Sequence, residues 1–172
     1  GLIDRTNHIT LKEASSGILA TLTVEVISHI YPQTKKSPYK VICRDNFAEI
    51  TLVFFHAYKD YLQRTLPLGS KCIISGKIDS FGNRWQMSHP DYILPLERQK
   101  EMPEKEPVYP LTAGLSGKML GKSVKQALEK LPALPEWLDL PLMQKEGWKD
   151  WKTSMLAIHN PETLADIDEN SP

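Results

Sequence analysis

Hydrophobic and polar residues alternate in the first half of the chain, and hydrophobic residues recur at helical spacing in the second half. The alternating runs are residues 19–30, 39–45, 48–55, 71–79 and 84–94. In the first run Leu22, Val24 and Val26 share one face, and threonine and glutamate side chains share the other, as in a half-buried strand. Turn-forming sequences separate neighbouring runs, with RDNF after the second run and SFGN after the fourth. The pattern therefore predicts five short strands, with Gly82 at positive φ in the SFGN turn.

Strands of this number and length suit a five-stranded Greek-key barrel of the OB-fold type. Residues 56–70 lie between the third and fourth runs and carry Leu62 and Leu66, where an OB-type barrel has a helix or loop that closes one end. Gly76 interrupts the fourth run, which suits a bulge or a sharp bend. We therefore predict a mainly β fold, with an OB-fold barrel over residues 19–96 followed by a small helical C-terminal region.

The segments on either side of the predicted barrel differ from it in composition. Residues 1–18 are predicted to be a lead-in from a preceding helical region, and a sequence that opens on Gly1 is expected to be a piece of a longer protein. Residues 97–107 are rich in charged side chains and contain two prolines, which predicts an exposed linker.

Residues 108–172 are predicted to form a helical connector. One helix is expected to begin at a capping Ser116 and to continue while hydrophobic residues recur at helical spacing. A second short helix is expected within residues 135–147, and a third after a capping Asp150. The acidic residues that end the chain are expected to be frayed.

Composition argues against several classes of protein. No apolar run approaches the roughly 18 residues that a membrane span needs, so we expect no membrane span and a cytoplasmic location. Cys43 and Cys72 do not form a CxxC pair and are predicted to be buried reduced thiols, with a disulfide as the alternative. The five histidines lack metal-ligand spacing, which predicts no metal site.

The sequence also lacks the motifs of common catalytic sites. SGKMLGKS at residues 116–123 ends like a phosphate-binding P-loop, but Ser116 stands where the first glycine is required and no strand pattern precedes it. No GxSxG, HExxH or GxGxxG motif is present. We therefore expect neither catalysis nor a bound cofactor in these residues. The net charge is zero, but a basic surplus before residue 99 permits an anionic partner for the first half.

Four aromatic rings, Phe54, Phe55, Tyr58 and Tyr61, gather where the third run ends. Phe54 continues the hydrophobic face of the strand and is expected in the core, whereas Phe55 is expected to face outward. OB-type barrels bind single-stranded nucleic acid with rings that stack on bases and basic side chains that contact phosphates. The predicted DNA-binding residues are Phe55, Tyr58, Tyr61, Lys35, Lys36, Lys40, Arg44, Arg84 and Trp85. The alternative is structural: the tyrosines close the barrel end, Trp85 packs against the core, and the lysines belong to a solvated loop.

Several motifs resemble the wedge domain of the RecG family of bacterial ATP-dependent DNA helicases. They are TLVFF at 51–55, ISGKI at 74–78, QMSHPDY at 86–92, PVYPLTAGLSGKML at 107–120, LPEW at 134–137 and LAIHNP at 156–161. The resemblance covers nearly the whole chain. It implies an OB-fold wedge that stands at the branch point of forks, Holliday junctions, D-loops and R-loops and splits the strands there during repair and recombination.

The same resemblance implies roles for individual residues and partners. Phe55 corresponds to one stacking ring of the family, and either Tyr58 or Tyr61 corresponds to the other. ATP and Mg²⁺ are implied only for motor domains, whose motifs these residues lack, so the chain itself is expected to hydrolyse nothing. A monomer associated with the bacterial nucleoid is expected. The alternative is an OB-fold protein-interaction module that binds the tail of a single-strand-binding protein.

Overall fold

The computed structural model describes residues 2–34, 36–55 and 58–160. These residues form two compact units. The barrel unit contains residues 5–104, and the helical unit contains residues 2–4 together with the described residues from 105 onward.

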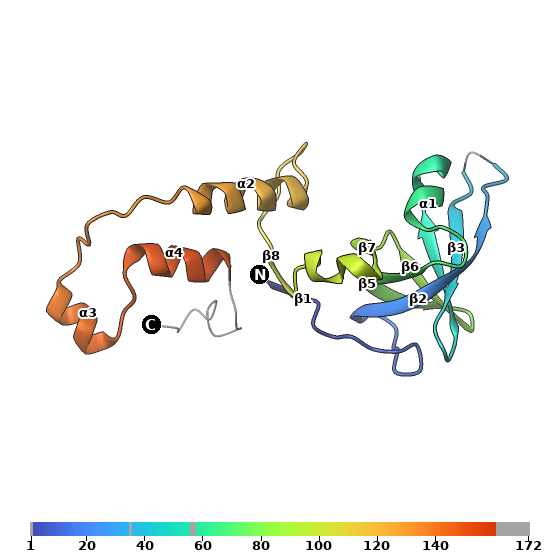
Figure 1. Cartoon of the computed structure of the whole chain (residues 1–172), viewed down its shortest axis with the longest axis horizontal. Helices are drawn as coiled ribbons and strands as arrows, with labels where there is room; N and C mark the ends of the chain where they lie inside the picture. The colour runs from blue at the N-terminus through green and yellow to red at the C-terminus, as the bar shows by residue number, and fades with distance from the viewer. Residues whose placement is uncertain (1, 35, 56–57, 161–172) are drawn as a thin grey trace. The chain divides into compact units, whose positions relative to one another are not determined.

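The barrel unit is built on one curved sheet (Figure 1). Its strands are β2 (Leu19–Ile30), β3 (Tyr39–Arg44), β4 (Glu49–Phe54), β5 (Lys71–Phe81), β6 (Arg84–Ser88) and β7 (Tyr92–Pro95). The strand order is β2-β3-β4-β6-β5-β7, and β5 also pairs with β2, so that the first five of these strands close into a ring. The pairing of β4 with β6 is parallel and the other pairings are antiparallel. The prediction of a mainly β fold of the OB type is confirmed.

Alternation along the strands places the core inside the ring. The inward side chains include Leu22, Val24, Val26, Val41, Cys43, Ile50, Leu52, Phe54, Cys72, Ile74, Ile78 and Met87, all of which are buried. Helix α1 (Lys59–Thr65) lies in the segment predicted to close the barrel and contributes Leu62, with Leu66 just beyond it. Cys43 and Cys72 are buried free thiols, as predicted, and burial raises the pKa of both.

The prediction of one strand over residues 84–94 is wrong, because the chain leaves the sheet at His89 and re-enters it at Tyr92. The His89 backbone has a φ of 46°, and its N–H still donates to the carbonyl of Val53 in β4 at 2.9 Å. Pro90 has no N–H to continue that ladder, and the next N–H, of Asp91, donates to Ser75 of β5 at 2.8 Å. The segment therefore changes its backbone hydrogen-bonding partner from β4 to β5.

The first of the two alternatives predicted for Gly76, a bulge, is not found. Gly76 pairs in regular register with Ala20, so no bulge occurs at this position. A Cβ at this position would lie 3.0 Å from Met87 Sδ and 3.3 Å from Pro90 Cα. Glycine is therefore required because the segment after β6 passes close to the strand. The predicted turns hold: Gly82 has a φ of 61°, and Asp45 Oδ1 accepts the N–H groups of Phe47 and Ala48.

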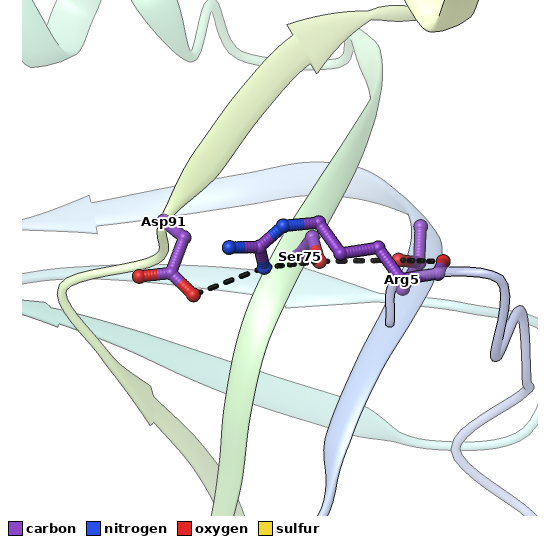
Figure 2. Close-up of polar contacts among 4 residues, drawn as sticks. Arg5, Ser75 and Asp91 are labelled. Carbon is purple, nitrogen blue, oxygen red and sulfur yellow. Dashed lines mark hydrogen bonds and ion pairs between the residues drawn. The ribbon is translucent and has the colours of Figure 1, made fainter. Parts of the chain in front are cut away.

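Residues 5–18, part of the expected lead-in, pack against the closed sheet and contribute Leu11 to its hydrophobic core. Leu11 is buried, and its N–H donates to Asp45 Oδ2 at 2.6 Å. Arg5 is only 2 % exposed, and its Nη1 lies 3.0 Å from Asp91 Oδ2 and 3.2 Å from the hydroxyl of Ser75. Figure 2 shows the Arg5 side chain crossing β5 to reach Asp91. The lead-in and the segment after β6 are thereby tied to the same strand.

The segment 97–107, expected as an exposed linker, contains regular structure. The 3₁₀ helix η1 (Leu96–Glu101) occupies its start, and the Met102 side chain is buried. Strand β8 (Lys105–Pro107) then pairs antiparallel with β1 (Leu2–Asp4) in the helical unit. The charged residues of this segment therefore lie on short ordered elements, which hydrophobic periodicity does not reveal.

The helical unit contains α2 (Gly117–Glu129), α3 (Leu140–Glu146) and α4 (Trp151–His159). The predicted caps are confirmed: Ser116 Oγ accepts the N–H of Met119 at 3.3 Å, and Asp150 Oδ1 accepts the N–H of Thr153 at 2.9 Å. No helix in the described part of the chain is both long and apolar enough to cross a membrane.

Candidate nucleic-acid interface

The rings singled out in the sequence lie together at the end of the barrel unit where β4 finishes. Phe54 is only 7 % exposed, whereas Phe55 is 48 % exposed, so the predicted inward and outward directions are confirmed. Tyr58 directly precedes α1 and is 84 % exposed, and Tyr61 within α1 is 55 % exposed. We call this surface, with the loop of residues 31–38 beside it, the aromatic end. His56 and Lys35 lie outside the described residues.

Helix α1, which supports these aromatic rings, is anchored to the barrel unit. Leu62 and Leu66 are fully buried beneath it. The ring of His29 bridges the helix to the sheet, with Nε2 2.8 Å from the carbonyl oxygen of Leu66 and Nδ1 2.7 Å from the hydroxyl of Tyr39. Since a carbonyl only accepts, His29 Nε2 carries the proton and the Tyr39 hydroxyl donates to Nδ1. Burial raises the pKa of Tyr39 to about 12, so this hydroxyl keeps its proton.

The loop of residues 31–38 contributes a further ring that the sequence reasoning missed. The Tyr31 hydroxyl accepts a hydrogen bond from Gln63 Nε2 of α1 at 2.8 Å. The ammonium of Lys59 lies 4.6 Å from the centre of the Tyr31 ring. Lys36 is exposed and Lys40 half-buried near the same end. The only sequence signal for Tyr31 is its place directly after the first strand.

Phe55 itself is fixed to the segment after β6. Its N–H donates to Nε2 of His89 at 3.1 Å, and the two rings are 5.7 Å apart at an angle of 31°. His89 belongs to the QMSHPDY motif of residues 86–92, but it was not among the predicted DNA-binding residues. An aromatic residue after a buried strand and a histidine next to proline are weak signals separately, and only the strand order brings them together.

Three of the predicted DNA-binding residues lie at the other end of the closed sheet. Arg44 pairs in register with Glu49 and Trp85 with Ile50, five and four positions along β4 from Phe54. At about 3.3 Å per residue this places them roughly 15 Å from the aromatic end. Arg84 precedes Trp85 at the β5–β6 hairpin. We call this surface the hairpin end.

At the hairpin end the predicted residues have other partners. Arg44 Nη2 lies 3.3 Å from Glu25 Oε2, and Trp85 packs against the core. A cleft of about 790 Å³ opens here, and its lining includes Glu25, Arg44, Phe47 and Lys71. Because acidic and basic side chains are mixed in this lining, the cleft is a poorer match for a phosphate backbone than the aromatic end.

Comparison with protein families decides what kind of domain carries these features. The model of the RecG wedge domain matches residues 4–131. The chain belongs to the RecG wedge domain family. The match includes the whole barrel unit and reaches through α2 of the helical unit.

Full-length RecG proteins align with this wedge domain along most of its length. The ATP-dependent DNA helicase RecG of Aquifex aeolicus (strain VF5) is 24 % identical over 172 residues, covering 94 % of this chain and 22 % of that protein. The Bacillus subtilis (strain 168) RecG is 32 % identical over 117 residues, covering 66 % of this chain and 16 % of that protein. The chain thus spans about a fifth of the length of the relatives that it matches.

A solved structure shares the fold of this wedge domain. A structure described as RecG bound to a three-way DNA junction superimposes with a TM-score of 0.79 at 21 % identity. The superposition covers 96 % of this chain and 23 % of that one. Both units of the chain therefore fall within the region that shares the fold of that structure.

Proposed function

We propose that this chain is the DNA-binding wedge module of a RecG-type helicase, and that its aromatic end stacks on unpaired bases at a DNA branch point. The observation that carries the proposal is a set of exposed aromatic rings whose neighbouring side chains are buried in the core. Phe55, Tyr58 and Tyr61 are exposed, while their neighbours Phe54 and Leu62 are buried in the core. The relative solved with a three-way DNA junction supports this choice of ligand.

Stacking on these rings is large enough to matter for strand separation. Each base stacked on an aromatic side chain contributes about 1–3 kcal/mol. Each base-pair step that opens loses about 1.4 kcal/mol of DNA stacking on average. Phe55 and one tyrosine, each stacked on one base, would therefore offset the opening of about one to four steps. Tyr58 and Tyr61 are both exposed, and both remain candidates for the second ring.

Basic side chains at both ends would contact the DNA backbone. Lys36 and Lys40, with Lys35, are proposed to neutralise phosphates next to the stacked bases. Arg44 and Arg84 lie too far along the strands to contact the same nucleotide, and we assign them to another arm of the junction. Trp85 packs against the core, which favours its structural alternative over base contact.

The activity of the whole protein is part of the same proposal. RecG relatives are named ATP-dependent DNA helicases, so ATP hydrolysis with Mg²⁺ is assigned to motor domains outside this chain. We propose forks, Holliday junctions, D-loops and R-loops as substrates, a monomer as the active form, and the bacterial nucleoid as its location. The tail of a single-strand-binding protein as a partner stays a prediction, which competition between such a peptide and the junction would test.

The test compares one ring at each end of the barrel unit. Fluorescence anisotropy at low salt would measure binding of the wild-type chain to a labelled three-way junction and to a linear duplex of equal length. Phe55→Ala removes a ring of the aromatic end. Phe47→Ala is the matched control, because Phe47 is 57 % exposed but lies in the β3–β4 turn at the hairpin end.

We expect the wild-type chain to prefer the junction and Phe55→Ala to bind it roughly 5- to 150-fold more weakly, which corresponds to about 1–3 kcal/mol. Phe47→Ala should bind like the wild type. Equal weakening by both substitutions would assign the interaction to general electrostatics or stability and contradict the stacking role. No junction binding by the wild-type chain would contradict an autonomous DNA-binding module, and the same pair of substitutions would then be tested in the full-length protein.

A further inference from the structure

The segment between β6 and β7, residues 89–91, is held to the sheet on both sides. On one side the His89 N–H donates to Val53 of β4 at 2.9 Å. On the other side the Asp91 N–H donates to Ser75 of β5 at 2.8 Å, and the Asp91 carboxylate meets the guanidinium of Arg5 at 3.0 Å (Figure 2). Pro90 lies over Gly76, where there is room for no side chain. This segment is therefore a fixed part of the barrel unit.

His89 is the one described residue other than glycine with a positive φ, at 46°. This backbone conformation costs free energy for a residue with a side chain, and such residues persist where the surrounding structure determines them. Glycine or asparagine would adopt the same backbone more easily. The presence of an imidazole at this position therefore calls for a reason that lies in the side chain.

The imidazole of His89 contacts Phe55 in two ways. Its Nε2 accepts the N–H of Phe55 at 3.1 Å, which requires that Nε2 carry no proton. Its ring lies beside the Phe55 ring, with centroids 5.7 Å apart, and makes a T-shaped contact with the Phe54 ring, with centroids 6.1 Å apart. Phe55 follows the last residue of β4, so this bond fixes the backbone at the point where the ladder of β4 has ended.

We propose that His89 is a positioning residue for Phe55: its Nε2 and its ring hold the Phe55 backbone and side chain in the outward direction before DNA binds. The inference rests on the proposed function of Phe55 as a stacking ring. A ring that is already oriented loses less conformational freedom on binding, so the contact strengthens binding without touching the DNA.

The test uses substitutions that distinguish the effect of the hydrogen-bond acceptor on His89 from the effect of its backbone conformation. His89→Gly suits the positive φ but removes both the acceptor and the ring. His89→Gln replaces the ring by a chain whose amide oxygen reaches about as far as Nε2 and can accept the same N–H. Ser88→Gly is the matched control, because it adds the same backbone freedom at the neighbouring position, where the side chain bonds only to Gln86 within the described residues.

Three quantities would be measured for each variant of the 172-residue chain. Anisotropy gives junction affinity, urea unfolding gives stability, and hydrogen exchange of the Phe55 amide reports whether its N–H is still bonded. We expect His89→Gly to bind the junction roughly three- to tenfold more weakly, with an unfolding midpoint unchanged and a faster-exchanging Phe55 amide. His89→Gln should recover part of the affinity and of the amide protection, and Ser88→Gly should resemble the wild type.

A double-mutant cycle distinguishes positioning from direct contact. In the Phe55→Ala background, His89→Gly should have no further effect on junction affinity, because the ring that it positions is gone. An equal effect of His89→Gly in both backgrounds would overturn the inference and make His89 a DNA contact in its own right. Wild-type affinity of His89→Gly would also overturn it and leave the proposed function intact. If Phe55→Ala itself bound normally, the proposed function would fail, and amide exchange would still decide whether His89 holds Phe55.

Discussion

Gly76→Ala is expected to destabilise the barrel unit, although the φ of Gly76 is one that any residue adopts. The new Cβ would lie 3.0 Å from Sδ and 3.3 Å from Cγ of Met87, and 3.3 Å from Cα of Pro90. Met87 is fully buried, and the main chain of Pro90 is flanked by two backbone hydrogen bonds to the sheet. Neither neighbour can move away without disturbing the packing or the ladder.

The expected loss follows from two opposing effects. Forcing one extra methyl group into a packed interior costs about 1–3 kcal/mol. Alanine has fewer accessible conformations than glycine in the unfolded chain, which offsets about 0.4–1 kcal/mol. The net loss is therefore about 1–2 kcal/mol. In a unit of this size each kcal/mol lowers the melting temperature by roughly 4–8 °C.

Urea unfolding followed by circular dichroism would measure this loss, with two further substitutions as controls. Met87→Ala should relieve part of the overlap, so the double variant should be about 1 kcal/mol more stable than the sum of the single effects. Gly82→Ala is the contrasting case, because Gly82 has open space around its Cβ position but a φ of 61°. Its cost arises in the backbone, so Met87→Ala should not reduce it. A Gly76→Ala chain as stable as the wild type, or strict additivity with Met87→Ala, would refute the steric explanation.

Four other outcomes are expected. Phe54→Ala should cost about 3–5 kcal/mol in urea unfolding, because its ring fills the core, whereas Phe55→Ala should cost less than about 1 kcal/mol; equal costs would contradict the inward and outward assignment. Asp45→Ala should cost about 1–3 kcal/mol by the same assay, since its carboxylate accepts three backbone N–H groups; a loss below about 0.5 kcal/mol would show that water replaces it. Burial raises the pKa of Cys72 from 9.0 to about 11, so the stability that the buried neutral thiol contributes is complete below pH 9 and is lost as the pH rises to 11. The urea midpoint should therefore fall less between pH 9 and pH 11 in Cys72→Ala than in the wild type, and an equal fall in both proteins would contradict this. Lys36→Gln should reduce the salt dependence of junction binding by about one ion, measured as the slope of log affinity against log salt, and an unchanged slope would remove Lys36 from the interface.

Much of the barrel could be predicted because alternation is decided locally. In the first strand the faces of Leu22, Val24 and Val26 follow from spacing alone, and the direction of Phe55 follows from that of Phe54. The break at Pro90 was missed because RWQM and YIL were joined into one strand across the polar residues SHPD. There the constraint is not periodicity but the missing N–H of proline and the change of partner strand.

The candidate site was predictable residue by residue but not as an arrangement. The number of residues between two positions does not tell which end of a closed sheet each one occupies. Arg44 and Trp85 were therefore grouped with Phe55, although the pairing of β4 places them at the opposite end. The contact between His89 and Phe55 joins positions far apart in the chain and depends on the parallel pairing of β4 with β6. Only the strand order supplies that information.

The position of Phe55 has a mechanical consequence for a module that stands in the path of moving DNA. Phe55 continues β4, which is hydrogen-bonded on both sides, to β3 along residues 49–54 and to β6 along residues 50–53. A load applied to the ring along the strand direction therefore acts on two ladders in shear, and many hydrogen bonds must break together before the strand yields. A ring on an edge strand, loaded in the same direction, would engage only one ladder, and fewer hydrogen bonds would resist the load.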